Sequence, residues 1–153
     1  MLLRKKKTKP SQQSEEKYRV LFEHASDAIV IVDFATQKIL EANRQAEILT
    51  GYAQAELLTM TVSDFRIRKD EKELSMSLLR SVAKRKSVNL RERQIRRKDG
   101  RLWWIEMNAS AVEYHGKQAV LAIVRDISQR KQIETTTLEI ANQHTRPPVL
   151  YQD

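Results

Sequence analysis

The feature that most constrains the fold is a tight-turn signal, Lys98-Asp99-Gly100, between two segments of β-strand character. Glycine accepts the positive φ angle that short hairpins need. The segment before the turn, about residues 88–97, is charged, and the segment after it, about residues 102–113, is aromatic, apolar and partly alternating. A further strand is expected at about residues 118–127, after a second turn at Tyr114–Lys117. Consecutive strands joined by short turns predict an antiparallel sheet.

The first part of the chain predicts one helix and two short strands. Ser14 can cap this helix, because a serine hydroxyl accepts a hydrogen bond from the first turn. Its apolar side chains recur at helical spacing on one face: Tyr18, Leu21 and Phe22. The β-branched run at residues 28–32 is typical of a buried strand, and a second short strand is expected at residues 38–42.

Several helices are expected elsewhere in the chain. In chain order, they lie at about residues 44–50, 53–58, 70–85 and 129–142, and residues 61–65 are expected to form a turn or a single helical turn. Asn43 is an N-cap candidate, Gly51 is a C-terminal stop and Ser128 is expected to cap the last helix through its hydroxyl. The order of elements predicts an α+β fold: a five-stranded antiparallel sheet with short helices on one face and flanking N- and C-terminal helices.

Composition excludes several kinds of chemistry. The chain has 153 residues, contains no cysteine and carries a net charge of +8. It can therefore form no disulfide, thiolate metal site or cysteine nucleophile. No apolar run approaches the roughly 18 residues of a membrane span. We expect a cytoplasmic protein without a membrane span, and much of its positive charge lies in a tail at residues 4–9.

Four segments resemble the PAS domain, a sensory module of bacterial signalling proteins, and they occur in the same order as in that family. They are Asp27–Asp33, the N-x-x-A…G-Y pattern of Asn43–Tyr52, the R-K-D-G…W hairpin of Arg97–Trp104, and Asp126–Ser128 in place of Asp-Ile-Thr. The resemblance covers about residues 15–134. It implies a module that senses or transduces a signal inside a larger protein, as in two-component systems, with an effector such as a histidine kinase in the same polypeptide.

The resemblance also divides the chain. Residues 1–13 are predicted to be a disordered basic tail, and residues 14–127 the PAS sensory domain with its N-terminal helix. Residues 128–144 are expected to form an output helix, and residues 145–153 a linker or the start of a following domain. The family's output helix leaves from the end of the domain, so Asp126 and Ser128 are predicted to couple the sheet to that helix. Asp126 is expected to pair with a basic group of the neighbouring hairpin, Arg97 or Arg101, because an unpaired carboxylate at the end of a buried strand would be costly.

The family's ligand pocket lies between the inner sheet face and the short helices. Strand alternation and the helix pattern give the candidate lining: Ala28, Val30, Val32, Ala46, Leu49, Arg93, Ile95, Ile105, Met107, Val120, Ala122 and Val124. This lining is almost wholly aliphatic. It fits either a filled core or a small cavity for an apolar or weakly polar ligand. Arg93 could hold a ligand carboxylate or extend to water at the sheet margin.

No cofactor is expected. The flavin light-sensing subclass needs a cysteine, and Ile95, Ile105 and Val124 stand where that subclass places amides. Family haem sites commonly use a histidine on the longer helix, and residues 70–85 contain none. The three histidines are scattered and form no metal-ligand pattern. No Gly-rich phosphate loop or catalytic triad is present, so we expect no enzymatic activity.

The partners follow from the same reasoning. Trp104 is expected on the outer sheet face, where the apolar face of the N-terminal helix (Tyr18, Leu21 and Phe22) or a second copy could cover it. We therefore expect a homodimer. One alternative is a ligand-free dimerisation or spacer domain. Another, which the lack of interleaved aromatic residues disfavours, is a nucleic-acid-binding protein that uses the basic tail.

Overall fold

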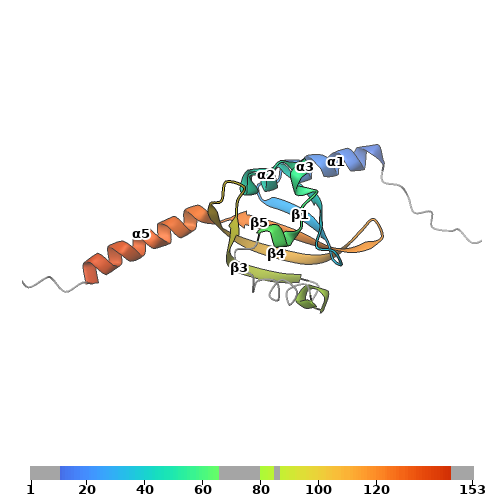
Figure 1. The fold of residues 1–153 in the computed structure, drawn as a ribbon. Helices are drawn as coiled ribbons and strands as arrows, with labels where there is room; N and C mark the ends of the chain where they lie inside the picture. Colours follow the sequence, from blue (N-terminus) through green and yellow to red (C-terminus); the bar gives the residue numbers. More distant parts are fainter. Residues whose placement is uncertain (1–10, 66–79, 85–86, 146–153) are drawn as a thin grey trace, which may run out of the picture.

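The centre of the molecule is a five-stranded antiparallel sheet with the strand order β2-β1-β5-β4-β3 (Figure 1). The strands are β1 (Ala28–Asp33), β2 (Ile39–Ala42), β3 (Ser87–Arg96), β4 (Leu102–Tyr114) and β5 (Lys117–Asp126). The computed structural model describes residues 11–65, 80–84 and 87–145. The first and last strands of the chain, β1 and β5, are neighbours, so the sheet is complete only when these segments, which are distant in the sequence, pair. The α+β prediction is confirmed.

Helices precede, interrupt and follow the strands. They are α1 (Gln12–Glu23), α2 (Arg44–Thr50), α3 (Gln54–Leu57), the 3-10 helix η1 (Val62–Phe65) and α5 (Ser128–Thr145). Residues 80–84 are also helical, while the rest of the helix predicted at residues 70–85 lies outside the described residues. The basic residues 4–9 and the final eight residues lie outside them as well. In Figure 1, α1 and α5 project from the domain in different directions.

The start of α1 differs from the prediction. Ser11 caps the helix, and its Oγ accepts a hydrogen bond from the backbone N–H of Ser14 at 3.2 Å. Ser14 therefore lies inside the first turn and is not the cap. Both residues are serines at a polar helix start, so composition alone could not distinguish them.

The hydrophobic core lies between one sheet face and the short helices. Its fully buried members include Ala42, Ala46, Leu57 and Val82. Ala42 belongs to β2, whereas Ala46 and Leu57 belong to α2 and α3, so small and aliphatic side chains of both layers meet in the core. The helical segment 80–84 contributes Val82, which is 1% exposed.

The turn between β3 and β4 has the predicted character. Gly100 has a φ of +85°, and the Arg97 backbone N–H donates to the Arg101 carbonyl at 2.9 Å. Asp99 stabilises the turn, because its Oδ1 accepts a hydrogen bond from the Arg101 N–H at 2.9 Å. Glycine is favoured here because a side chain rarely adopts that φ.

A β-bulge interrupts β3, which the sequence did not predict. The register with β4 shifts between Leu90 and Arg93, and Glu92 has a φ of +42°. Val88 and Ile95 both pack against the core, although strict alternation would place residues seven apart on opposite faces. The bulge supplies the extra residue that turns both of them inward.

Asn43 joins three elements through its buried side chain, which is 0% exposed. Its Oδ1 accepts hydrogen bonds from the backbone N–H groups of Ile29 at 2.9 Å and Ala46 at 3.1 Å. Its Nδ2 donates to the carbonyl oxygens of Phe22 at 2.9 Å and Asp27 at 3.0 Å. The amide thus caps α2 and also fixes the end of α1 and the start of β1. All four of its side-chain bonds are made.

We predict that Asn43→Ala lowers the free energy of unfolding by about 3 kcal/mol, because a helix cap is lost and buried backbone groups lose their partner. Chemical denaturation measures this change. Asn108→Ala is the matched control, since Asn108 is exposed on the sheet. Equal stability of the two variants would show that the Asn43 network contributes little.

Candidate functional site

The structure gathers the predicted lining residues between the inner face of the sheet and helix α2. Eight of them are buried: Ala28, Val32, Ala46, Leu49, Ile105, Val120, Ala122 and Val124. Three more pack against the same cluster and are partly buried: Val30, Ile95 and Met107. Arg93 is half-buried, and its Cα pairs with that of Ile105 across the β3–β4 ladder. The buried members of the cluster are aliphatic, and a ligand within it stays a prediction.

Trp103 is an inner-face residue that the list of candidates missed. It packs against the core cluster, and its Nε1 atom is buried without a hydrogen-bond partner among the described residues. The guanidinium carbon of Arg97 lies 4.1 Å from the centre of its ring, in cation–π geometry. Strand alternation could have identified Trp103 as an inner-face residue, because Trp103 and Ile105 lie on the same face of β4.

Arg97 fixes the β3–β4 hairpin to the end of α2. Its Nε donates to the carbonyl of Leu49 at 3.0 Å and its Nη2 donates to the carbonyl of Ile48 at 3.2 Å. The backbone N–H of Lys98 donates to the Thr50 carbonyl at 2.9 Å. Helix C-termini leave carbonyl groups without partners, and the hairpin supplies three donors for them.

The link between β5 and α5 differs from the prediction. Asp126 is exposed, and its Oδ1 accepts a hydrogen bond from the backbone N–H of Ser128 at 2.8 Å. The expected pairing of Asp126 with Arg97 or Arg101 is wrong, because those two side chains pair with Asp99. Ser128 Oγ is buried and has no hydrogen-bond partner among the described residues. The carboxylate of Asp126, not the Ser128 hydroxyl, therefore satisfies a donor at the helix start.

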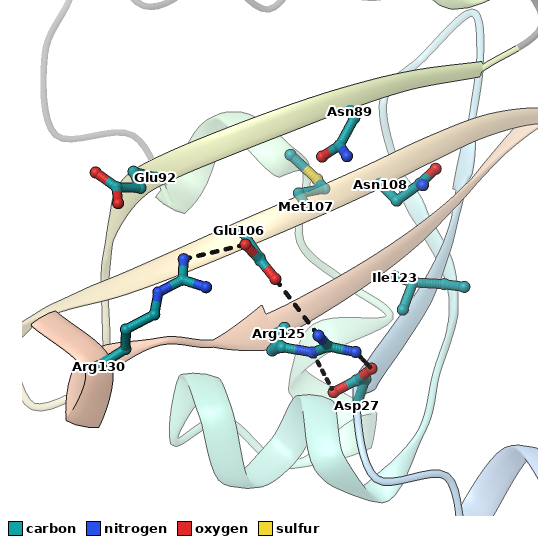
Figure 2. A pocket seen from close by; sticks show the side chains of 9 residues that line it. All are labelled: Asp27, Asn89, Glu92, Glu106, Met107, Asn108, Ile123, Arg125 and Arg130. Atoms are coloured by element: carbon teal, nitrogen blue, oxygen red, sulfur yellow. Dashed lines mark hydrogen bonds and ion pairs between the residues drawn. The ribbon is translucent and has the colours of Figure 1, made fainter.

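An open groove of about 1020 Å³ lies on the outer face of the sheet (Figure 2). Its lining residues are Asp27, Asn89, Glu92, Glu106, Met107, Asn108, Ile123, Arg125 and Arg130. Met107, which was expected on the inner face and packs against the core there, also borders this groove, and the other eight residues were not candidates from the sequence. The charged side chains of this groove pair with residues of different helices and strands. Such pairs can be recognised only when the positions of these elements in the fold are known.

A chain of ion pairs crosses this groove, as the dashed lines in Figure 2 show. Arg125 of β5 pairs with Asp27 at 3.3 Å and with Glu106 of β4 at 3.6 Å. Glu106 also pairs with Arg130 of α5 at 3.1 Å. The network therefore connects the residue before β1 to the first turn of α5.

Lys131 makes the second attachment of α5 to the sheet. Its Nζ forms an ion pair with Glu92 at the β3 bulge and lies 4.9 Å from the centre of the Trp104 ring. Hydrogen bonding to Lys131 lowers the pKa of Glu92, and hydrogen bonding to Glu92 raises the pKa of Lys131. The side chain that lies over the Trp104 ring is thus Lys131 of α5, whereas the sequence predicted the N-terminal helix or a second copy there.

The N-terminal helix lies elsewhere than over Trp104. Phe22 is buried and stacks with Tyr18 at 5.7 Å, while Leu21 is 65% exposed. Burial, followed by the charge and hydrogen bonding of Glu41, raises the pKa of Tyr18. The same causes, in the same order, raise the pKa of Tyr114 to about 12. The expectation that α1 packs near Trp104 is therefore corrected: it contacts the Glu41 and Tyr114 end of the sheet.

Two further classes of feature were sought in the described part of the chain. No group of three or more His, Asp or Glu side chains comes together there in a way that could hold a metal ion. No helix among those residues is long and apolar enough to cross a membrane.

The comparisons with known proteins agree with the geometry. The PAS fold family matches residues 16–127, and the chain belongs to that family. A PAS domain of an HTR-like protein from Haloarcula marismortui has a TM-score of 0.66 at 24% identity, over 75% of this chain and 93% of that one. A domain of a sensory box sensor histidine kinase/response regulator from Geobacter sulfurreducens has a TM-score of 0.60 at 26% identity, over 73% and 93% of the two chains.

A curated relative places such a domain in a larger protein. The methyl sulfide methyltransferase-associated sensor of Methanosarcina acetivorans is 25% identical over 125 residues, which are 80% of this chain. The chain spans 12% of the length of that relative. The chain is thus a PAS sensor domain similar to domains of sensor kinases and of a sensor protein.

We predict that Arg97→Lys lowers the free energy of unfolding by about 1–2 kcal/mol. A lysine cannot donate to both α2 carbonyls and stack on Trp103 at once. Thermal or chemical denaturation measures the loss. Arg101→Lys is the control, because its side chain is 78% exposed, and a loss of equal size there would contradict a special role for Arg97.

A second prediction concerns alkaline pH. An unfolded tyrosine titrates near pH 10, whereas folding raises the pKa of Tyr114 to about 12. The stabilisation is therefore complete below about pH 10 and is lost as the pH rises from there through about 12. Denaturant midpoints measured across this window should fall less for Tyr114→Phe than for the wild type. Tyr52→Phe, which removes a hydroxyl elsewhere, should follow the wild type.

Proposed function

We propose that this chain is the signal-sensing and dimerisation module of a larger signalling protein, with no enzymatic activity of its own. In this proposal a ligand or a packing change at the inner face is relayed through α5 to an effector in the same polypeptide. The observation that carries it is the path of the chain at Asp126. The last strand passes into a projecting 18-residue helix through the single buried residue Ile127.

The sensing step is assigned to the inner face. Aliphatic side chains there would accept a small apolar or weakly polar ligand, and Arg93 together with the Trp103 N–H adds polar groups at one end. Neither flavin nor haem is part of the proposal, because the chain has no cysteine and its inner face is aliphatic. Similarity to domains of sensor proteins supports a sensing role.

Dimerisation is assigned to the exposed apolar side chains of the two flanking helices. On α5 these are Ile133, Leu138 and Ile140, which are 59%, 63% and 50% exposed. Ile133 and Ile140 are one heptad apart, the spacing of residues on one seam of a helix pair. Burial of such side chains against a second copy would remove apolar surface from water.

We predict that the double variant Ile133→Glu, Ile140→Glu shifts the full chain from dimer to monomer, because a charge cannot be buried in an apolar seam. Sedimentation equilibrium over a range of concentrations measures the shift. Gln132→Glu adds a charge at an exposed position of the same helix and should leave the dimer intact. A monomeric wild type, or a dimer that survives the double variant, would refute this assignment.

Ligand sensing has a separate test. Native mass spectrometry of the purified full chain should reveal a bound small molecule in excess of the polypeptide mass. Arg93→Ala should reduce its occupancy if the ligand is a carboxylate. If protein purified after several expression conditions shows only the mass of the polypeptide, the alternative of a ligand-free dimerisation or spacer domain is favoured.

A further inference from the structure

The first turn of α5 is attached to the outer sheet face by two adjacent basic residues. Arg130 pairs with Glu106 of β4. Lys131 pairs with Glu92 of β3 and lies over the Trp104 ring. The Lys131 side chain is only 20% exposed, compared with 48% for Arg130. The lysine is therefore the more enclosed of the two attachments.

Glu92 occupies an unusual backbone position. It lies in the β3 bulge, and its φ of +42° is a conformation that non-glycine residues rarely adopt. Backbone strain of this kind persists only where the surrounding structure imposes it. The next residue, Arg93, pairs with Ile105 of the inner face. One short segment of β3 thus carries both an inner-face residue and the carboxylate that holds α5.

We propose that Glu92 is a positioning residue whose ion pair with Lys131 sets the angle at which α5 leaves the sheet. This inference rests on the proposed function, in which α5 carries the output. The bulge has two arrangements. In the engaged arrangement Lys131 lies on Glu92 and Trp104. In the released arrangement the bulge has shifted, Lys131 is hydrated, and α5 is held through Arg130 and Asp126.

The other ion pairs cannot perform this role. Glu134 also pairs with Lys131, at 3.3 Å, but both residues belong to α5, so their contact does not depend on the sheet. Glu106 divides its carboxylate between Arg125 and Arg130, which fixes β4 and β5 together whatever β3 does. Among the residues that the structure describes, the contact between Glu92 and Lys131 is the one ion pair that joins the bulge to the helix. A change in the bulge biases α5 because the two arrangements differ in this contact.

The absence of cysteine makes the angle of α5 measurable in the full chain. Gln118→Cys on β5 and Glu139→Cys on α5 place one spin label on the sheet and one on the helix, both at exposed positions and neither at a residue assigned to dimerisation. Pulsed electron–electron resonance then gives the distance distribution between them. Dilution with unlabelled chains removes distances between copies.

Glu92→Gln should broaden and shift this distribution, and amide exchange in residues 129–135 should accelerate up to about fivefold, the range of an exposed ion pair. Glu134→Gln is the matched control, because it removes a Lys131 ion pair within the helix, and it should change neither measurement. The charge-exchanged double variant Glu92→Lys, Lys131→Glu should restore the wild-type distribution. Equal distributions for the wild type, Glu92→Gln and Glu134→Gln would overturn the proposal.

Glu92→Gly separates positioning from stability. Glycine accepts the positive φ, so the melting temperature should hold or rise while α5 is released. A purely structural role for Glu92 predicts the opposite: a lower melting temperature and an unchanged distance distribution. Neither readout uses ligand binding, dimerisation or an effector. If Glu92→Gln leaves the angle of α5 unchanged, the role of Glu92 is refuted but the proposed function is not. If the dimerisation and ligand tests fail, the measured angle of α5 still decides the role of Glu92.

Discussion

The buried side-chain amide of Asn43 links three consecutive elements, α1, β1 and α2, by hydrogen bonds. Asn43 lies where α1 ends, β1 begins and α2 starts, and its side chain bonds to a backbone group of each. Replacement of these bonds by water is impossible at full burial, so the backbone must keep this arrangement or leave polar groups unpaired. The position of β1 sets the register of β2 and β5, which pair with it on either side. The edge of the core beneath α2 therefore depends on Asn43.

The opposite end of α2 is fixed in a different way. The β3–β4 hairpin places Arg97 and Lys98 against its last carbonyl groups, and Gly51 ends the helix with a φ of +78°. A side chain at Gly51 would meet the Lys98 Cβ at 3.4 Å, so the small residue also permits the close approach. Both ends of one short helix are thus satisfied by groups distant in sequence. That explains how seven residues, too few for a stable isolated helix, keep one position over the sheet.

Local signals predicted much of this fold. Gly100 indicated the hairpin, Asn43 indicated the start of α2, and strand alternation indicated the inner face. The features that were missed depend on residues far apart in the sequence or on an inserted residue. The bulge at Glu92 has no glycine to mark it, and alternation carries no information about an extra residue. Lys131 is 39 residues from Glu92, so no local pattern links them.

The same distinction applies to the candidate site. Alternation placed the aliphatic strand residues on the side of the sheet that faces the short helices, and their role as a ligand lining stays a prediction. The predicted partner of Asp126 was wrong, because a carboxylate at a strand end can pair either with a distant cation or with the backbone two residues ahead, and the sequence favours neither. The outer-face ion pairs could be predicted only from the relative positions of β1, β4, β5 and α5 in the fold. Each of these elements was predicted, but the side of the sheet on which their charged ends meet was not.

The outer-face attachments are weak individually, and this weakness suits the role proposed for them. An exposed ion pair contributes about 0.2–1 kcal/mol, so its loss changes the balance between two helix positions up to about fivefold and leaves the core unaffected. The core between the sheet and the short helices instead consists of buried aliphatic side chains, and protein interiors resist small displacement. The chain thus combines a buried inner layer, fixed by Asn43 and Arg97, with a helix held at its first turn by partly exposed ion pairs. In the proposed role, a small shift of β3 would reach α5 without unfolding any element, because Glu92 and the inner-face residue Arg93 are adjacent in the chain at the bulge.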